Sequence, residues 1–386
     1  MKIAFFHHTM RLGSGIDTVI YELATRLAKK HDVTVFCFKT NYKYDQCNFQ
    51  LREIKSFVAN TPLRMMTLAP FIFDKVGSLQ SEIKSFDVVN THHYPANYIV
   101  RNLNGPIKIV TEWSGVTPSL FSSMKEKLYI KVSRWGNKVA AQKADIVLAP
   151  GDFINRWIRQ NYSINAITMF LDGINFQIFD KSRVNSDRFF QLYPSLEGKE
   201  IILFVGRITE SKNIHSLIEV FSLVKKRISD TALMLVGDYQ NYLSYYKRLK
   251  EIIKSKGLDD SIFFAGVVPW EDLPSFFAAC SVYATCSLWE GFLRAEAYAF
   301  EKPIVAFNTT SHYETVKDGK TGFLVENYSI NEFADKIYRL LIDKKLAREL
   351  GKNGYHWAKE NLDFDLIAKR FESLCLNYNN YKSRNI

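Results

Sequence analysis

The sequence alternates short apolar segments with amphipathic ones, and this alternation starts twice. The first series opens with an apolar run at 2–7, and a segment at 17–30 follows whose apolar residues recur every three or four positions. A second series begins at 200–205 and continues with a helix-like segment at 214–228. Buried parallel strands read as near-continuous apolar runs, and helices with one apolar face pack against them. The alternation therefore predicts an α/β fold with two Rossmann-like, doubly wound parallel sheets.

The other segments extend the same pattern, and their order suggests where the domains end. We expect further strands at 33–38, 87–91, 107–111, 145–149, 232–236, 262–265, 281–284 and 303–307, and helices at 242–256, 294–300, 314–316 and through 330–380. Polar and charged residues dominate 172–199, between the two series. We therefore predict one domain over 1–178, a second over 179–362, and a terminal helix in 363–386 that returns to the first domain.

Composition excludes several classes of protein. The chain has 386 residues, of which 47% are hydrophobic and 24% charged, as in a globular protein. Its apolar runs are strand-sized and fall short of the roughly 20 residues that a membrane span needs. The first apolar run is too short for a signal peptide. Five cysteines at irregular spacings favour neither a disulfide framework nor a zinc site. We expect a cytoplasmic protein.

The net charge of +11 is concentrated in the first half of the chain. Residues 1–180 carry 22 basic and 14 acidic side chains, whereas 181–386 carry 29 and 26. A basic surface concentrates anions such as phosphates, anionic lipid or nucleic acid, although a solvated basic face without a partner fits the charge equally well. We expect no nucleic-acid partner, because no helix-turn-helix, zinc or RNA-binding motif is apparent.

The segment 120–143 mixes cations with large apolar residues, including Trp135. A basic amphipathic helix of this kind can lie on an anionic membrane, and tryptophan suits the lipid–water interface. An ordinary amphipathic helix on the protein surface is an equal alternative. The first reading predicts peripheral attachment at the inner face of the cell membrane and a lipid-linked or cell-envelope glycan as acceptor.

Two glycine-containing loops join a strand end to a helix start, where ligands bind in open α/β sheets. In the first, Gly13 and Gly15 would let the backbone approach an anion at the helix N-terminus, but a tight structural turn is the alternative. In the second, Gly206 is followed by Arg207 and Lys212. A guanidinium and an ammonium over one crevice suit a diphosphate, whereas the alternative is a pair of solvated loop cations.

A third loop, over 287–296, carries two carboxylates. Glu290 precedes the predicted helix and Glu296 lies near its start. Carboxylates accept the paired hydrogen bonds that vicinal hydroxyls of a sugar or ribose donate. The alternative for Glu296 is an acidic residue that favours the helix dipole.

Together, the order and spacing of these segments from Lys2 to about Tyr378 resemble the retaining glycosyltransferases of family 4, which have the GT-B fold. The similarity continues through Gly237, Gly266, the segment 296–299 and the segment 314–325. It implies two domains that face each other across a cleft, and an enzyme that moves a sugar from a nucleotide-diphosphate sugar to a hydroxyl of a glycan or lipid-linked acceptor. The alternatives are a GT-B nucleotide-sugar epimerase and a non-catalytic binder of nucleotide sugars or polyanions.

The resemblance also implies roles for individual residues. Arg207 and Lys212 would hold the donor diphosphate, with Gly13, Gly15 and Gly206 at the phosphates. Glu290 would contact the donor sugar and Glu296 the ribose. The backbone of Gly291, Phe292 and Leu293 would line the sugar, and the backbone near Val267 the base. His92 or His93 would face the acceptor, although a buried, satisfied histidine is the alternative.

The chain departs from the family pattern at two positions. The family usually has seven residues between its two glutamates, and this chain has five, which leaves the donor sugar open. Where the family commonly has a histidine after the strand at 107–111, this chain has Glu112 and Trp113. Trp113 could stack on a sugar or fill the core. No Asp-x-Asp motif stands in a supporting context, so we expect no essential metal and no cofactor besides the donor; the oligomeric state is left open.

Overall fold

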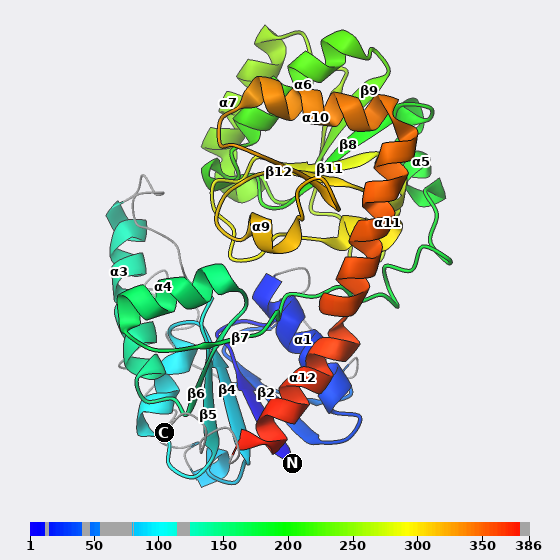
Figure 1. The fold of residues 1–386 in the computed structure, drawn as a ribbon. Helices are drawn as coiled ribbons and strands as arrows, with labels where there is room; N and C mark the ends of the chain where they lie inside the picture. Colours follow the sequence, from blue (N-terminus) through cyan, green and yellow to red (C-terminus); the bar gives the residue numbers. More distant parts are fainter. Residues whose placement is uncertain (12–14, 41–46, 55–78, 80, 114–123, 379–386) are drawn as a thin grey trace. The chain divides into compact units, whose positions relative to one another are not determined.

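The computed structural model describes all residues except 12–14, 41–46, 55–78, 80, 114–123 and 379–386 (Figure 1). The chain divides into two compact units. Unit 1 comprises Met1–Gly173 together with Phe364–Ile386, and unit 2 comprises Ile174–Asp363. The second unit therefore interrupts the first, which closes with the C-terminal helix. The sequence predicts these boundaries after residues 178 and 362, whereas the structure divides the chain after Gly173 and after Asp363.

Unit 1 contains one parallel sheet with the strand order β3-β2-β1-β4-β5-β6-β7. Its strands are β1 (Lys2–Phe6), β2 (Asp32–Cys37), β3 (Gln50–Glu53), β4 (Val88–His92), β5 (Ile107–Thr111), β6 (Ile146–Ala149) and β7 (Ile167–Thr168). The helices are α1 (Gly15–Leu27), the 3₁₀ helix η4 (Ala96–Asn102), α3 (Met124–Ala141), α4 (Asp152–Tyr162) and α12 (Phe364–Leu376). Because the strand order reverses beside β1, the ends of β1 and β4 form a switch point of the kind at which ligands bind.

Strand β1 is buried on both faces, which explains its uninterrupted apolar sequence. Ile3 and Phe5 belong to the core that includes α1 and α12, whereas Ala4 and Phe6 belong to the core beneath η4 and α3. Side chains alternate across a strand, so two-sided burial requires apolar residues at successive positions. The strand is thus held between two helical layers.

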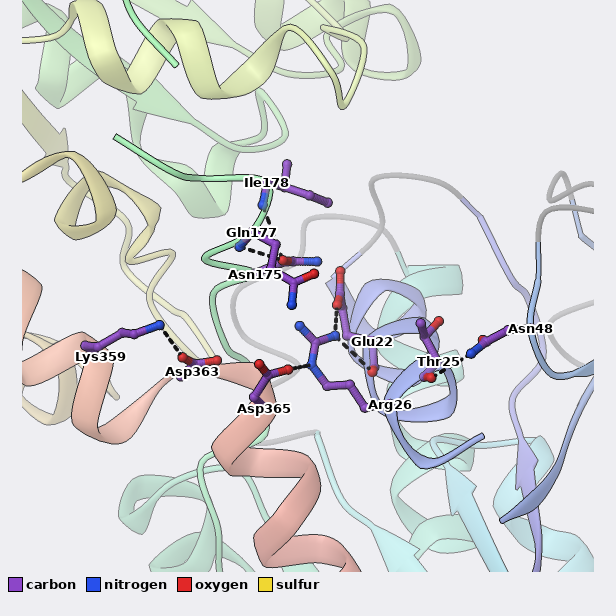
Figure 2. Close-up of polar contacts among 10 residues, drawn as sticks. All are labelled: Glu22, Thr25, Arg26, Asn48, Asn175, Gln177, Ile178, Lys359, Asp363 and Asp365. Atoms are coloured by element: carbon purple, nitrogen blue, oxygen red, sulfur yellow. Dashed lines mark hydrogen bonds and ion pairs between the residues drawn. The ribbon is translucent and has the colours of Figure 1, made fainter. Parts of the chain in front are cut away.

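Helix α12 joins unit 1 through apolar packing on α1 and through ion pairs that involve Asp365 and Glu372. Phe364, Ile367 and Phe371 enter the same core as residues of α1. The Arg26 guanidinium bonds the Asp365 carboxylate at 2.5 Å and also pairs with Glu22 one turn away (Figure 2). Arginine can serve two carboxylates because its donors are arranged in a planar fork.

Unit 2 contains a second all-parallel sheet, with the order β10-β9-β8-β11-β12-β13. The strands are β8 (Glu200–Val205), β9 (Thr231–Val236), β10 (Ile262–Gly266), β11 (Val282–Thr285), β12 (Ile304–Phe307) and β13 (Gly322–Val325). The helices and 3₁₀ helices are α5 (Asp187–Leu192), η6 (Pro194–Leu196), η7 (Glu210–Lys212), α6 (Ile214–Arg227), η8 (Gln240–Tyr242), α7 (Leu243–Ser255), α8 (Leu273–Ala279), η9 (Glu296–Phe300), α9 (His312–Thr315), α10 (Ile330–Ile342) and α11 (Lys344–Asn361).

The main core of unit 2 lies between the sheet and the helices α6, α7 and α10, which cover one side of it (Figure 1). Within this unit, Lys359 of α11 bonds Asp363 at 2.5 Å, next to the point where the chain passes into α12 (Figure 2). Both units are thus doubly wound parallel sheets, and the predicted fold class is confirmed.

The structure corrects several predicted elements. Residues 330–380 are not helical throughout, because α10 ends before Asp343 and α11 before Leu362. Asp343 caps the N-terminus of α11 by accepting a hydrogen bond from the backbone N–H of Leu346, which starts a new helix there. The segment 294–300 forms the 3₁₀ helix η9 from Glu296 onward, and the helix expected at 314–316 begins already at His312. Within the described part of the chain, every helix is too short or too polar to cross a bilayer.

Candidate functional site

Lys212 and Glu290 form an ion pair at the carboxyl edge of the sheet in unit 2. Lys212 ends the short 3₁₀ helix that follows β8, and Glu290 lies in the loop that follows the neighbouring strand β11. The Nζ of Lys212 lies 2.5 Å from Oε1 of Glu290, and both side chains are mostly buried. The parallel sheet brings the two loops together because adjacent parallel strands end at the same edge.

Burial lowers the pKa of Lys212, since desolvation disfavours its charged form; the Glu290 carboxylate opposes this shift, and the nearby Arg207 and Arg294 guanidinium groups add to it. A lysine ammonium held among other cations is a strong anion-binding group, because an incoming anion would relieve their mutual repulsion. The cations at this edge of the sheet therefore favour the binding of an anion.

A loop after β12 fixes the backbone of Glu290. The Glu290 N–H donates to the hydroxyl of Thr310 at 3.0 Å, and the Ser311 hydroxyl donates to the Glu290 carbonyl at 3.1 Å. The preceding Leu288 is held from the other side, where its N–H donates to the Ser211 carbonyl at 3.0 Å. Glu290 is therefore positioned by backbone contacts on both flanks, which is how a preorganised binding group is held.

Arg207 lies in the loop after β8, within electrostatic reach of Lys212. Its side chain is exposed, and Nη1 donates to the hydroxyl of Tyr242 at 3.1 Å. The adjoining glycines allow two strand ends to meet. Gly237 has φ +141°, and a Cβ on it would lie 1.9 Å from the carbonyl oxygen of Gly206. The close approach therefore requires glycine at Gly237.

Glu296 begins η9 and is buried next to the same site, where Arg294 pairs with it through Nη2 and Oε1. Arg294 comes from the loop that is shorter than the family pattern, and its guanidinium also opposes protonation of Lys212. Glu296 is therefore paired with Arg294 through one carboxylate oxygen, and its predicted contact with the ribose stays a prediction.

The remaining predicted donor-binding positions differ in exposure. Phe292 and Leu293 are buried in the ligand-free protein. Val267 follows β10 and is exposed. Gly15 begins α1 of unit 1, where a Cβ would meet no atom within 4 Å. Gly13 lies outside the described residues, and the assignment of phosphate contacts to it stays a prediction.

The predicted acceptor-side residues cluster at the end of β4 in unit 1. The indole Nε1 of Trp113 donates to Nδ1 of His92 at 3.1 Å, and both side chains are buried. Trp113 therefore orients His92 and lacks the exposed face that stacking on a sugar would need. Burial lowers the pKa of His92 well below its usual value and that of His93 to about 4, and His7 adds to both shifts. Both rings are consequently neutral near pH 7.

His7 itself lies between two acceptors. Its Nε2 is 3.0 Å from the Asp17 carboxylate, and its Nδ1 donates to the His92 carbonyl at 2.9 Å. Asp17 also accepts from the backbone N–H of Arg11 at 2.8 Å. This buried arrangement ties the end of β1 to the first turn of α1 and to the end of β4, and it was not singled out from the sequence.

Sequence reasoning also missed His312 and Arg294 in unit 2. His312 is fully buried, and the Glu290 and Lys212 charges act on its ring. The sequence around it, Asn-Thr-Thr-Ser-His, reads as an ordinary polar loop. Arg294 could have been noticed, because it lies inside the shortened interval between the two glutamates. No group of three or more His, Cys, Asp or Glu side chains suited to a metal ion occurs among the residues that the structure describes.

Two family models match the chain in succession. The model for Glycosyltransferase Family 4 matches residues 13–177, and the model for Glycosyl transferases group 1 matches residues 185–357. The first covers most of the N-terminal segment of unit 1 and ends at Gln177, just inside unit 2, and the second spans the site in unit 2.

Similar proteins include two curated relatives and one solved structure. The capsular polysaccharide biosynthesis glycosyltransferase CapM of Staphylococcus aureus is 27% identical over 207 residues, about half of each chain (51% of both). A GDP-mannose-dependent α-(1-6)-phosphatidylinositol monomannoside mannosyltransferase of Mycolicibacterium smegmatis is 25% identical over 93% of this chain and 94% of its own. The structure of Anabaena HepE in complex with UDP and glucose superposes with a TM-score of 0.80 at 19% identity, over 97% of this chain and 98% of that one.

The two models follow the division into units, and the superposition covers both parallel sheets. The chain therefore belongs to the family 4 glycosyltransferases of the GT-B fold, a class of nucleotide-sugar-dependent transferases.

Proposed function

We propose that this enzyme is a retaining hexosyltransferase that moves a sugar from a nucleotide-diphosphate sugar to a hydroxyl of a glycan or lipid-linked acceptor. The observation that carries the proposal is the pairing of Lys212 with Glu290 at the carboxyl edge of the unit 2 sheet. The Lys212 ammonium suits a phosphate and the Glu290 carboxylate suits a sugar hydroxyl, so a sugar diphosphate supplies partners for both groups.

The relatives support this class of donor. The mycobacterial relative is named for GDP-mannose, and the HepE structure contains UDP and glucose. Both are nucleotide-linked hexoses or their parts, although their bases and sugars differ. The identity of the base and of the sugar in this enzyme is accordingly part of what the experiment must determine.

The chemistry assigned to the cations is stabilisation of the leaving group. When the bond between the anomeric carbon and the phosphate oxygen breaks, negative charge develops on the diphosphate. Lys212 and Arg207 would stabilise that charge more strongly in the transition state than in the ground state, and one well-placed donor of this kind contributes about 3 kcal/mol. We assign the deprotonation of the acceptor hydroxyl to a phosphate oxygen of the leaving group.

A panel of nucleotide sugars tests the proposal. UDP-glucose, UDP-galactose, UDP-N-acetylglucosamine and GDP-mannose are incubated with the enzyme, and nucleoside diphosphate release is measured with and without glycan acceptors. The anomeric configuration of the earliest product, read by proton NMR, tests retention. A product of the opposite configuration contradicts retention. A change of sugar stereochemistry without transfer favours an epimerase, and binding without turnover favours a non-catalytic binder.

We propose further that helix α3 brings the enzyme to an anionic lipid surface. Its outward face carries Met124, Leu128 and Trp135, which are 77%, 47% and 54% exposed. With the exposed Lys131 they follow helical spacing, so they form one stripe. Exposed apolar side chains flanked by lysine and arginine suit the interface of an anionic bilayer. Residues 120–123 of the predicted segment lie outside the described part.

Flotation with phosphatidylglycerol vesicles tests this surface. We expect the enzyme to float with anionic vesicles at low salt and to remain behind with phosphatidylcholine alone. Replacing Leu128 and Trp135 by serine should abolish flotation, whereas replacing the exposed Leu243 of unit 2 by serine should not. Equal flotation of both variants contradicts the assignment to α3.

A further inference from the structure

His312 lies where it could help to select the transferred sugar, a role that rests on the proposed function. His312 is the first residue of α9 and is fully buried at the end of β12. The loop that leads into it is bonded to the backbone of Glu290 in both directions, through Thr310 and Ser311. Thr310 has φ +42°, a left-handed conformation that threonine rarely adopts. The histidine is therefore held beside the predicted sugar-binding carboxylate by a strained, well-bonded loop.

The hydrogen bond at Nδ1 fixes which nitrogen carries the proton. Nδ1 of His312 lies 2.6 Å from the carbonyl oxygen of Phe307. A carbonyl oxygen can only accept, so Nδ1 must donate, and in the neutral ring Nε2 then bears the lone pair. Burial lowers the pKa of His312 and Lys212 opposes its protonation, whereas Glu290 and the bond to Phe307 act the other way. The ring is thus a neutral imidazole with an acceptor at Nε2.

That acceptor has no partner in the ligand-free protein. Nε2 of His312 is buried and makes no hydrogen bond among the described residues. A buried polar atom without a partner costs roughly 1–3 kcal/mol. Native proteins rarely keep such an atom unless something else satisfies it, and function is one reason for keeping it.

The chemistry of the site limits what could satisfy Nε2. Diphosphate oxygens are acceptors at neutral pH, so they offer nothing to a second acceptor. The Lys212 ammonium bonds Glu290 and makes no hydrogen bond to Nε2 of His312. A sugar brings hydroxyl groups that donate, and Glu290 would bind such a group in the same site. We propose that His312 is a specificity-determining residue whose Nε2 accepts a hydrogen bond from a hydroxyl or amide N–H of the donor sugar.

A polar site built to bond a hydroxyl rejects the analogue that lacks it, because its own group is left unpaired. His312 should therefore discriminate between sugars, without affecting the affinity for the nucleotide. This separates it from Lys212 and Arg207, whose removal should weaken binding of nucleoside diphosphate and nucleotide sugar together.

The variant His312→Asn separates the two nitrogens of the ring. An asparagine amide N–H can take the place of Nδ1–H and donate to Phe307, but nothing replaces Nε2. The variant His312→Gln places an amide group near the Nε2 position and serves as the conservative counterpart. A thermal unfolding midpoint near that of the wild type shows that each variant folds.

Isothermal titration with UDP, GDP, UDP-glucose, UDP-galactose, UDP-N-acetylglucosamine and GDP-mannose provides the test. We expect His312→Asn to bind the nucleoside diphosphate within about twofold of wild type and to lose about tenfold in affinity for the matching nucleotide sugar, with partial recovery in His312→Gln. If the affinities for the nucleoside diphosphate and for the nucleotide sugar keep the wild-type ratio, whether both are unchanged or both are weakened equally, His312 does not select the sugar. The proposed function then stands. A wild-type enzyme that binds none of these ligands overturns both proposals.

Discussion

The ammonium of Lys212 and the carboxylate of Glu290 lie 2.5 Å apart, although they come from loops that follow two different strands. Each group is mostly buried, so a charge on either one without the other would carry a large desolvation penalty. A diphosphate would compete with Glu290 for Lys212, and the released carboxylate would then be available to a sugar hydroxyl. The pair thus keeps both groups desolvated and in place before a ligand arrives.

Replacing Lys212 by methionine should lower turnover by about 100-fold, because the leaving diphosphate loses one preorganised cation. The measurement is initial-rate release of nucleoside diphosphate at saturating donor. Lys226→Met is the matched control, since Lys226 is an exposed lysine of α6. If the two variants turned over equally, Lys212 would not be the diphosphate-binding residue.

The lowered pKa of Lys212 gives opposite pH trends for binding and for stability. Its buried ammonium loses the proton below the usual value of 10.5. Affinity for UDP should therefore fall as pH rises through the window beneath 10.5. Over that window the unfolded chain binds more protons than the folded one, so stability of the ligand-free protein should rise with pH.

Comparison with Lys212→Met isolates these trends from those of other lysines. Titration calorimetry with UDP and urea unfolding, each at pH 7.5 and at about pH 9.5 (between neutrality and the ordinary lysine pKa), give the two slopes. The wild type should show both trends more strongly than the variant. Identical slopes in the two proteins would assign the pH dependence to another group.

The sequence predicted those parts of the site that depend on local position. The positions of Arg207 and Lys212 after β8 were predictable, because they follow a recognisable apolar strand and the carboxyl ends of parallel strands bind ligands; their binding role stays a prediction. The pairing of Lys212 with Glu290 could not be read, since it depends on which loops the strand order brings together. His312 was missed for the same reason, because its burial and its contact with Phe307 are tertiary facts.

The fold class was predictable from apolar periodicity, whereas weakly apolar elements were not. Strand β3 buries only Leu51 among its four residues, so its sequence has no apolar run from which a strand could be predicted. The break at Asp343 could have been seen, because an aspartate before Lys-Lys-Leu is a good N-cap. The sequence-based prediction instead placed helix through Asp343, because the apolar residues on both sides of it keep a helical period.

Replacing Glu296 by alanine should weaken nucleoside diphosphate binding about tenfold. In the protein, Glu296 is paired with Arg294, so its loss removes an acceptor for ribose hydroxyls and also leaves a partly buried guanidinium without that carboxylate. Glu332→Ala in α10, on an exposed glutamate, is the control. Calorimetry with UDP and GDP supplies the affinities. An unchanged affinity would mean that Glu296 acts only as a structural partner of Arg294.

Replacing Gly237 by alanine should destabilise unit 2 by roughly 2–4 kcal/mol, through both overpacking and backbone strain. The new Cβ would lie 1.9 Å from the Gly206 carbonyl oxygen, at φ +141°, so the ends of β8 and β9 must separate. Gly257→Ala is a matched control, because Gly257 also has positive φ (+62°) but a Cβ there meets no atom within 4 Å. Only the strain term applies to it, and we expect a loss of about 1 kcal/mol. Urea unfolding measures the loss of stability in both variants. Initial rates of turnover should fall only for Gly237→Ala, because Arg207 follows Gly206 directly. Equal losses of stability in the two variants would show that the close contact between the strand ends is not needed.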